Sequence, residues 1–344
     1  MRFLSNEIKL DFDDVMLEPR FGGLPSRSLV KLTTKITAPR SGETFNVVPI
    51  IAANMDGVGT IEVARELYKH NVMCALTKHY DVDTLVEFFS SEESALSFYS
   101  MGINSTDWDK FVEINEKIPI KRCCIDVANG YQDSFYDFIK QVRIYSPYIT
   151  IMAGNVVTSV AVERAAQAGA DIIKIGIGGG AQCTTRLMTG VGYPQLSAII
   201  ETKNSTWLND VLLCSDGGCT VPGDVSKAIA AGANLVMLGT MLAGTDEGGG
   251  DIVDGKVLFY GMSSKTANNK HFGGLKNYRS SEGRTTMIPY KGTMADTIGH
   301  ILGGIASTCT YVGANTLAEL PQNAYAIRVN NTHNKSSEKY TIGN

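Results

Sequence analysis

Short apolar runs rich in β-branched residues recur along this chain and alternate with stretches of helix-forming composition. The segments between the runs, such as Ile61–His70, Ser159–Ala168 and Gly223–Ala231, have the composition of helices. Strands that are apolar on both faces and joined through helices form parallel sheets, and eight such units in roughly 250 residues match a (β/α)8 barrel. The sequence therefore predicts an α/β fold, a TIM (β/α)8 barrel. Its predicted strands are Val47–Ala53, Val72–Leu76, Arg122–Val127, Ile149–Ala153, Asp171–Ile175, Val211–Cys214, Leu235–Leu238 and Val257–Tyr260.

A doubly wound parallel sheet is the alternative architecture for this alternation. Its first strand–helix unit would carry a GxGxxG phosphate-binding turn and an acidic residue at the usual spacing, and the first predicted strand is followed by neither. We therefore expect a single barrel domain over residues 1–330. The segment 264–289, rich in Gly, Ser, Asn and Lys and without a clear period, is predicted to be a mobile active-site flap. The polar residues 331–344 are predicted to form a flexible tail.

Composition argues against several classes of partner. The net charge of -4 is spread without long charged blocks, so we expect no nucleic-acid partner. The amino terminus lacks the apolar core of a signal peptide, and no run reaches the length of a membrane span. The seven cysteines show no zinc-site spacing. These features predict a cytoplasmic protein with reduced thiols and a small-molecule substrate, and no membrane partner.

Polar residues gather directly after the predicted strands. In a barrel the carboxyl ends of all strands meet at one face, and active sites lie at that face. We therefore expect the functional site there. The segments concerned are Asn54-Met55-Asp56, Lys78, Asp126, Gly154-Asn155, the loop around Cys183, Ser215-Asp216-Gly217-Gly218, Gly239-Thr240 and Gly261-Met262-Ser263.

Cys183 follows a glycine-dense run, 176–180, and precedes Thr185 and Arg186. Glycines let backbone N–H groups approach an anion closely, and these groups together with the Arg186 guanidinium would favour the thiolate, which is the nucleophilic form of cysteine. Cys183 is therefore the predicted nucleophile. The alternative for a lone cysteine is a buried, inert thiol. That interpretation fits the cysteines within apolar strands: Cys74, Cys123, Cys124 and Cys214.

Two further loops indicate a nucleotide. Ser215–Gly218 and Gly239-Thr240 follow successive predicted strands, and glycine-rich strand ends late in a barrel commonly present N–H groups to a phosphate. Each loop alone is equally consistent with a tight βα turn. The Asp216 carboxylate is suited to sugar hydroxyls, so a phosphorylated nucleotide is the better interpretation of the two loops together.

The run Tyr278–Arg284 lies in the predicted flap and would ordinarily be a solvated, charged loop. A thiol-based mechanism also needs an acid/base group. Glu282 would supply one if it met Thr185 when the flap closes.

Longer motifs run through the chain: Gly176-Ile177-Gly178 followed by Cys183–Arg186, then Thr189–Gln195, Ser215–Gly218 and Tyr260–Ser263. Together they resemble the IMP dehydrogenase/GMP reductase family, over a match from about Asp11 to Arg328. Dehydrogenases of the family usually carry two regulatory CBS modules between the second and third strands, and the stretch 81–121 leaves no room for such a CBS insert. Further motifs look like the reductase branch: Asn54–Asp56, Lys78–Tyr80, Ile125–Gly130, Tyr278–Gly283 and Gly303–Gly313.

The resemblance implies a homotetramer that converts GMP to IMP and ammonia with NADPH in purine salvage. The Cys183 thiolate would add to purine C2 and ammonia would leave. Hydride would then resolve the covalent thioimidate, while Thr185 and Glu282 move the proton. Implied substrate contacts are Asp216, Gly217, Gly218, Gly239, Thr240, Gly261, Met262, Ser263, Arg279 and Gly283.

The resemblance also implies an NADPH site and a potassium site. At the NADPH site, residues 26–27 and 307–310 would come from a neighbouring subunit. The implied cofactor contacts are Ser26, Arg27, Lys78, Asp126, Val127, Ala128, Ile177, Gly178, Tyr278, Ser307, Thr308, Cys309 and Thr310. The implied potassium residues are Gly178, Gly180, Cys183 and Arg186.

The Cys183 loop departs from the family pattern. Gly179 replaces a proline, Ala181 a serine that ordinarily helps to bind phosphate, and Gln182 an aliphatic residue. The Thr240 hydroxyl would lie in the same phosphate region and compensate for Ala181, whereas 245–247 resembles the dehydrogenase branch. Three alternatives stay open: an IMP dehydrogenase without CBS modules, a reductase of a modified or deoxy guanine nucleotide, and a non-catalytic nucleotide sensor.

Overall fold

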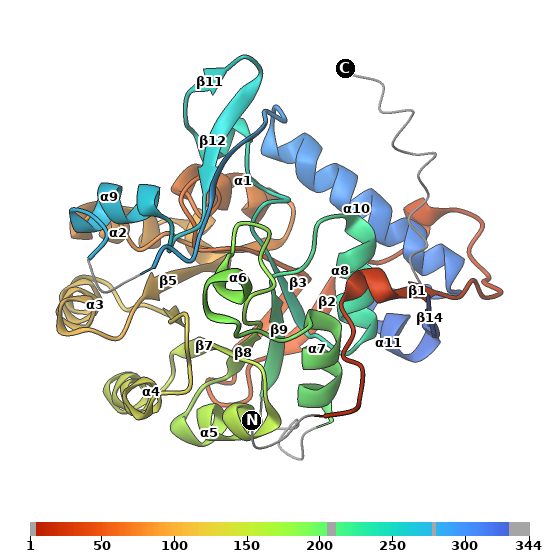
Figure 1. Ribbon diagram of the computed structural model, residues 1–344, viewed down its shortest axis with the longest axis horizontal. Coiled ribbons are helices and arrows are strands. Elements are labelled where there is room, and N and C mark those ends of the chain that lie inside the picture. Colours follow the sequence, from red (N-terminus) through yellow and green to blue (C-terminus); the bar gives the residue numbers. More distant parts are fainter. Residues whose placement is uncertain (1–4, 205–210, 277–279, 330–344) are drawn as a thin grey trace.

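A closed barrel of parallel strands forms the centre of the molecule, a computed structural model that describes residues 5–204, 211–276 and 280–329 (Figure 1). Each strand pairs in parallel with the next along the chain, and the last pairs with the first through Val236 and Ile50, which closes the barrel. The TIM-barrel prediction is therefore confirmed. The strands are β3 (Thr44–Ala52), β4 (Val72–Ala75), β5 (Ser97–Met101), β6 (Arg122–Asp126), β7 (Thr150–Val156), β8 (Ile172–Ile175), β9 (Leu212–Asp216) and β10 (Leu235–Leu238).

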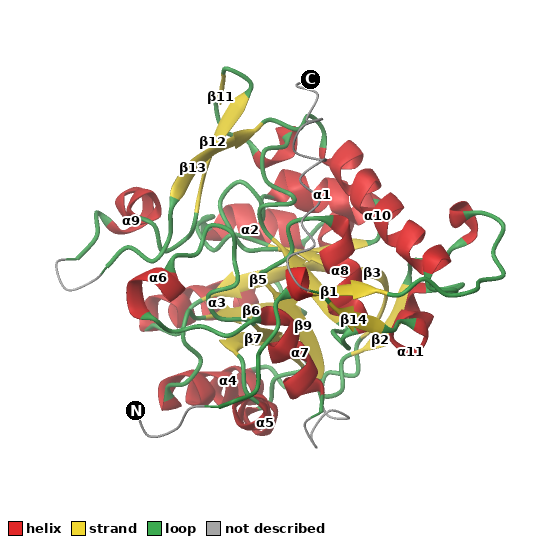
Figure 2. Ribbon diagram, turned by 45° about the vertical axis from the view of Figure 1, so that its right-hand side comes forward, coloured by secondary structure: helices red, strands yellow, loops and turns green. Residues whose placement is uncertain are grey.

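Helices cover the outside of the barrel (Figure 2). All residues of β4, β8 and β10 are buried, since these strands contact the barrel interior on one face and helices on the other. This packing explains the continuous apolar runs in the sequence. The covering helices are α1 (Ile61–Lys69), α2 (Val82–Phe89), α3 (Ser105–Lys117), α4 (Asp133–Tyr145), α5 (Ser159–Ala168), α7 (Gln195–Lys203), α8 (Pro222–Ala230) and α10 (Met294–Tyr311).

Short polar side chains begin several of these helices. Thr60, Asp81 and Asn104 each accept a hydrogen bond from a backbone N–H in the first turn of α1, α2 and α3. At the other end, α5 stops at Gly169, whose φ of 113° suits glycine. Each βα unit is therefore delimited by local sequence.

One predicted barrel strand is wrong and one was missed. Val257–Tyr260 lies in β12 (Lys256–Tyr260), which belongs to an antiparallel sheet with β11 (Ile252–Val253) and β13 (Thr285–Pro289). Leu258 of β12 is 50% exposed, so this strand has one solvent face. The missed barrel strand is β5, whose Ser97 and Ser100 are buried among apolar neighbours.

The β11–β12–β13 sheet, which lies between β10 and α10 in the chain, projects from the barrel (Figures 1 and 2). Both α9 (Lys265–Phe272) and β13 lie in the predicted flap, which therefore has more regular structure than the sequence suggested. Residues 277–279 of the flap and the predicted tail 331–344 lie outside the described residues. The mobility of the flap stays a prediction.

The remaining elements extend the sheet or flank the barrel. β2 (Thr34–Thr37) pairs antiparallel with β3, and β1 (Val15–Leu17) pairs antiparallel with β14 (Ala326–Arg328). The short helices are α6 (Thr185–Thr189), which follows the Cys183 loop, and α11 (Leu320–Asn323). The stretch 81–121 folds as α2, β5 and α3 of the barrel itself.

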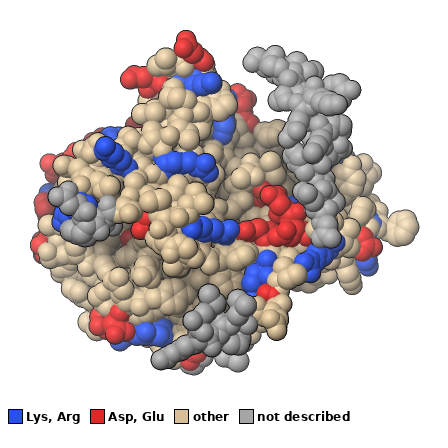
Figure 3. Space-filling model, viewed as in Figure 1, with Lys and Arg blue, Asp and Glu red and all other residues tan. Residues whose placement is uncertain are grey.

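Charged side chains of both signs are scattered over the face in Figure 3, where most of the surface is uncharged. Among the described helices, none is both long and apolar enough to cross a membrane.

Candidate active site

A cavity of about 290 Å³ opens at the carboxyl ends of the barrel strands. The loops that follow β3, β6, β8, β9 and β10 line it together with Asn155 of β7, as the barrel topology predicts. Predicted catalytic, substrate and cofactor residues share this cavity: Asp126, Val127, Ala128, Ile177, Gly178, Gly180, Cys183, Thr185, Asp216, Gly217, Gly218, Gly239, Thr240, Gly261, Met262, Ser263, Glu282 and Gly283.

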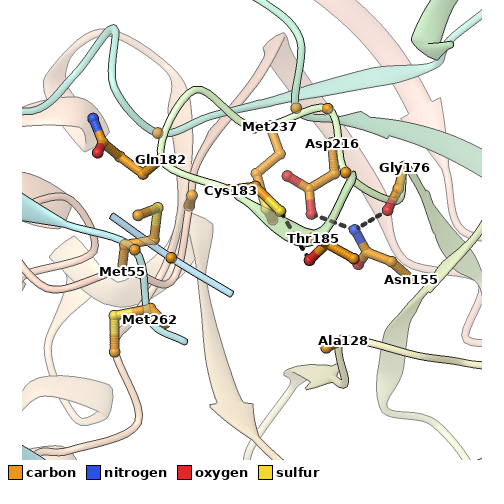
Figure 4. Close-up of a pocket in the computed structure, with 18 of the residues that line it drawn as sticks. Met55, Ala128, Asn155, Gly176, Gln182, Cys183, Thr185, Asp216, Met237 and Met262 are labelled. Atoms are coloured by element: carbon orange, nitrogen blue, oxygen red, sulfur yellow. Dashed lines mark hydrogen bonds between the residues drawn. The ribbon is translucent and has the colours of Figure 1, made fainter. Parts of the chain in front are cut away.

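Cys183, Thr185 and Glu282 form a hydrogen-bonded chain at the cavity wall. The Cys183 thiol donates to Thr185 Oγ1 over 3.2 Å, and Thr185 Oγ1 donates to Glu282 Oε2 over 2.7 Å. Figure 4 shows Cys183 and Thr185 facing each other beside Asp216. The arrangement joins a nucleophile to a carboxylate through one hydroxyl, so a proton can pass between them.

Backbone contacts hold the Cys183 loop against the predicted flap. Cys183 and Gly283 form an antiparallel β-bridge, and the Thr184 N–H donates to the Glu282 carbonyl over 2.9 Å. The Arg284 guanidinium donates to the Ala181 carbonyl. These contacts involve Glu282 and the two residues after it, so they hold its carboxylate beside Thr185. The predicted meeting of these two side chains is present in the structure.

Cys183 differs from the strand cysteines in its surroundings. It is partly exposed in the cavity wall. Burial raises the pKa of the other thiols, to about 12 for Cys124, which keeps them protonated and unreactive. The four cysteines that show this behaviour as predicted are Cys74, Cys123, Cys124 and Cys214.

A buried lysine that sequence reasoning missed joins two carboxylates of the cavity. Lys174, on β8, is 1% exposed, and its ammonium contacts Asp126 Oδ1 and lies 3.2 Å from Asp216 Oδ2. Burial would lower the pKa of Lys174, but Asp126 and Asp216 outweigh burial and raise it. Burial would likewise raise the pKa of Asp126, and Lys174 lowers it. Lys174 and Asp126 are therefore both charged at neutral pH. The one signal in the sequence was a lysine inside an otherwise apolar strand.

Asn155 is a second residue that the sequence analysis left without a role. Its Nδ2 donates to Asp216 Oδ2 over 2.9 Å and to the Gly176 carbonyl over 2.8 Å (Figure 4). Together with Lys174 it occupies one oxygen of Asp216. The other carboxylate oxygen stays available to a ligand in the cavity.

Gly176 allows the Cys183 loop to pass close to the end of β9. It has a φ of 152°, and a Cβ there would lie 2.0 Å from the Asp216 carbonyl oxygen. We expect Gly176→Ala to lower the free energy of unfolding by about 3 kcal/mol because it adds a clash to an unfavourable φ. Gly42→Ala is the matched control, with a φ of 73° and open space around its Cβ, and should cost only about 1 kcal/mol. Urea unfolding measures both, and equal costs would contradict this account.

Several predicted residues lie outside the cavity wall. Arg186 pairs with Asp11 over 3.0 Å and donates to the Tyr193 carbonyl over 2.7 Å. Its side chain packs against Gly178, where a Cβ would lie 2.7 Å from Arg186 Cγ. The structure therefore gives the Arg186 guanidinium a part in holding the loop, and its part in activating the thiol stays a prediction. The Lys78 ammonium lies 5.6 Å from the centre of the Phe272 ring.

The predicted cofactor residues at 26–27 and 307–310 lie together elsewhere. Arg27 donates to Ser307 Oγ over 2.8 Å, and Thr310 and Thr308 are partly exposed on α10. Cys309 is 0% exposed in the core, so its side chain cannot touch a molecule at this surface. Tyr278 and Arg279 lie outside the described residues.

The site has the features of an enzyme active site with a cysteine nucleophile. It lies in a cavity at the carboxyl ends of the barrel strands, where TIM-barrel active sites are found, and it contains the thiol–hydroxyl–carboxylate chain. The family model of the IMP dehydrogenase / GMP reductase domain matches residues 9–340. The chain belongs to this family. It is 50% identical over 336 residues to human GMP reductase 2, covering 96% of this chain and 97% of the relative.

Two further relatives are also named as GMP reductases. Human GMP reductase 1 is 49% identical over 338 residues, and GMP reductase of Shewanella pealeana is 47% identical over 339 residues. Each comparison covers 96% of this chain and 98% of the relative. The similarity thus extends over nearly the full length of both chains.

Proposed function

We propose that this protein is an NADPH-dependent reductase that converts GMP to IMP and ammonia through a covalent bond to Cys183. The observation that carries the proposal is the Cys183–Thr185–Glu282 hydrogen-bonded chain at the wall of a cavity that also holds Asp216. Relatives named GMP reductase, which are similar to this chain over nearly its whole length, support the same activity.

The chain of hydrogen bonds supplies the proton transfers of the first step. The thiol proton passes to Thr185 Oγ1 as the hydroxyl proton passes to Glu282, and the thiolate adds to purine C2. The proton then returns along the same path to the leaving amine, which departs as ammonia. A thioimidate between Cys183 and the purine remains.

The second step releases the product. The nicotinamide cofactor, when bound, supplies a hydride to C2. The bond between Cys183 Sγ and C2 then breaks with its electron pair on sulfur, and the product is IMP. In sum, GMP, NADPH and two protons give IMP, NADP⁺ and ammonium.

The cavity offers contacts that fit a nucleoside monophosphate. The Asp216 oxygen not engaged by Lys174 and Asn155 is suited to ribose hydroxyls. The glycine-rich strand ends would give N–H groups to the phosphate and the residues after β12 would contact the base. The substrate residues in this proposal are Gly217, Gly218, Gly239, Thr240, Gly261, Met262, Ser263 and Gly283, with Arg279 outside the described residues.

We place the nicotinamide beside the purine in the same cavity as part of this proposal. Asp126, Val127, Ala128, Ile177 and Gly178 line it, and one oxygen of Asp126 is free of the Lys174 contact. We extend the cofactor site to Lys78 and Tyr278. In a homotetramer, Ser26, Arg27, Ser307, Thr308 and Thr310 would contribute from a neighbouring subunit.

We also propose that a potassium ion orders the Cys183 loop. Hard cations take oxygen ligands, and the backbone carbonyls of Gly178, Gly180 and Cys183 lie in this one loop, with Arg186 packed against it. Replacing potassium by sodium should lower kcat while leaving the unfolding midpoint unchanged. Equal activity in both salts would remove the ion from the proposal.

Incubation with GMP and NADPH tests the function directly. We expect NADPH oxidation coupled to equal amounts of IMP and ammonia. Turnover with IMP and NAD⁺ alone would identify a dehydrogenase. A marked preference for a deoxy or modified guanine nucleotide would revise the substrate, and binding without turnover would identify a nucleotide sensor.

Glu282→Gln tests the proton path. The amide keeps a hydrogen bond to Thr185 but cannot accept the proton, so we expect kcat to fall by about 10²–10³-fold with little change in the Kd of GMP. Glu116→Gln, an exposed site on α3, is the matched control. Stopped-flow measurement should locate the loss in ammonia release, and an unchanged kcat would remove Glu282 from the mechanism.

A further inference from the structure

A buried carboxylate outside the catalytic chain collects four hydrogen-bond donors. Asp56 lies in the loop after β3, and its Oδ2 accepts from Tyr260 Oη over 2.7 Å, His271 Nε2 over 2.6 Å and Lys270 Nζ over 3.2 Å. Its Oδ1 accepts from Thr77 over 3.2 Å. Burial alone would raise the pKa of Asp56, but the bonds from His271 and Tyr260 and the Lys270 charge lower it to about 2. The carboxylate is thus ionised throughout the physiological range.

His79 completes this group. Its ring stacks on that of His271, with centroids 3.4 Å apart and planes within 5°. Burial and the neighbouring charges of His271 and Lys78 lower the pKa of His79 to about 4, so the ring is neutral at neutral pH. Its Nε2 is buried without a hydrogen-bond partner among the described residues. His79 therefore acts as a flat packing surface for His271. We call Asp56, His79 and His271 the Asp–His–His cluster.

A divalent ion is one candidate occupant, since the three side chains offer ligand atoms within 4.8 Å of one another. The structure favours a different role. The Lys270 ammonium already places a positive charge at Asp56 Oδ2, and parallel stacked rings do not direct their nitrogen lone pairs to one point. The cluster is built as a contact between protein segments.

Those segments are α9 and the barrel. α9 reads Lys-Thr-Ala-Asn-Asn-Lys-His-Phe, and its buried residues are Ala267 and Asn268, whereas Phe272 is 55% exposed. A helix with so little apolar surface gains little from hydrophobic burial. Polar contacts therefore have to supply much of the free energy that holds α9 against the barrel. Lys270 and His271 make such contacts with Asp56.

The cluster also touches two residues of the proposed cofactor and substrate sites. The Asp56 N–H donates to Met262 Sδ over 3.4 Å, and Met262 lines the cavity. Lys78 directly precedes His79, and its ammonium faces the Phe272 ring at the end of α9. A shift of α9 would therefore move the surroundings of Lys78 and Met262 together.

We propose that Asp56, His79 and His271 are positioning residues for the cofactor half of the reaction. They hold α9 against the barrel and thereby fix Lys78 and Met262 beside the cavity. This inference rests on the proposed reductase function for its kinetic consequence, whereas the docking of α9 stands independently of it.

Two substitutions at His271 separate the hydrogen bond from the ring stack. His271→Phe keeps a ring on His79 but loses the bond to Asp56, and His271→Gln keeps an amide donor but loses the ring. His300→Phe, at an exposed site on α10, is the matched control. We expect His271→Phe to raise the KM for NADPH about tenfold while the KM for GMP changes less than about twofold. His271→Gln should recover part of that loss.

Hydrogen exchange gives a second measurement that needs no activity. Amides of α9 should exchange about tenfold faster in His271→Phe than in the unchanged protein, and barrel amides should not. Unchanged α9 exchange, or an equal rise in both KM values, would overturn the proposal. If the unchanged protein failed to oxidise NADPH with GMP, the reductase function would fall, and hydrogen exchange would still decide whether the cluster docks α9.

Discussion

Cys183→Ser is expected to abolish turnover, with kcat lowered about 10⁴-fold or more. A serine hydroxyl is a far weaker nucleophile than a thiolate at neutral pH, and no other thiol that the structure describes shares the hydrogen bond to Thr185. The side chains are similar in size, so the cavity keeps its shape and GMP binding should change by less than about threefold. Steady-state kinetics and calorimetric titration with GMP measure the two quantities.

Cys74→Ala is the matched control for the loss of a thiol. Cys74 is buried in β4 and does not line the cavity, so its removal should cost stability but leave kcat within about twofold. Retention of substantial activity in Cys183→Ser would contradict covalent catalysis by this residue.

Lys174→Met is expected to lower stability strongly and in a pH-dependent way. The substitution leaves Asp126 and Asp216 without their buried cation, and removing one partner of such a group costs about 3–5 kcal/mol. We expect about 3 kcal/mol at pH 7, because the Asp126 side chain is 39% exposed and water partly screens it. Activity should also fall, since both carboxylates would lose their orientation in the cavity.

The pH dependence of this loss follows from the pKa shifts. Lys174 lowers the pKa of Asp126 in the folded protein, so the stabilisation is complete above the carboxyl pKa of the unfolded chain and is lost as pH falls through the folded value. In Lys174→Met, burial of the Asp126 carboxyl is no longer offset by the lysine and raises its pKa. The difference in unfolding free energy between the two proteins should therefore shrink from pH 7 to pH 4.

A double substitution controls for the lost packing of the lysine stem. Lys174→Met combined with Asp126→Asn removes one uncompensated charge and should recover about half of the lost stability at pH 7. The comparison needs urea unfolding of four proteins at pH 7 and pH 4. They are the unchanged protein, Lys174→Met, Asp126→Asn and the double variant. A pH-independent difference, or no recovery, would mean that packing and not charge explains the loss.

The barrel was predictable because most of its strands are buried on both faces. The two strand errors have one physical origin. β5 contains Ser97 and Ser100, which are buried although polar, and β12 contains Leu258, which is apolar although exposed. A pattern of apolar residues predicts which strands are buried. In β5 the fold buries polar residues, and in β12 it exposes an apolar one, so the prediction failed for both strands.

The residues of the catalytic chain were easier to predict from the sequence than the residues that hold the cavity in shape. Cys183 stood out among glycines and hydroxyls. The need for an acid/base group then indicated Glu282 beside Thr185, and the resemblance to the family implied their part in moving the proton. Lys174 carried a signal, a charge inside a buried strand, whose meaning depends on two carboxylates from neighbouring strands. Asp56 and His79 lay in segments that the sequence analysis had named, but nothing joined them to His271, since positions 56, 79 and 271 meet only through the fold.

Mass spectrometry of protein quenched during incubation with GMP tests the central claim most directly. In the absence of cofactor we expect an adduct with the mass of GMP less ammonia on the peptide that contains Cys183, and none in Cys183→Ser. A nucleotide adduct on another cysteine, or turnover in which no adduct ever forms at Cys183, would contradict the mechanism.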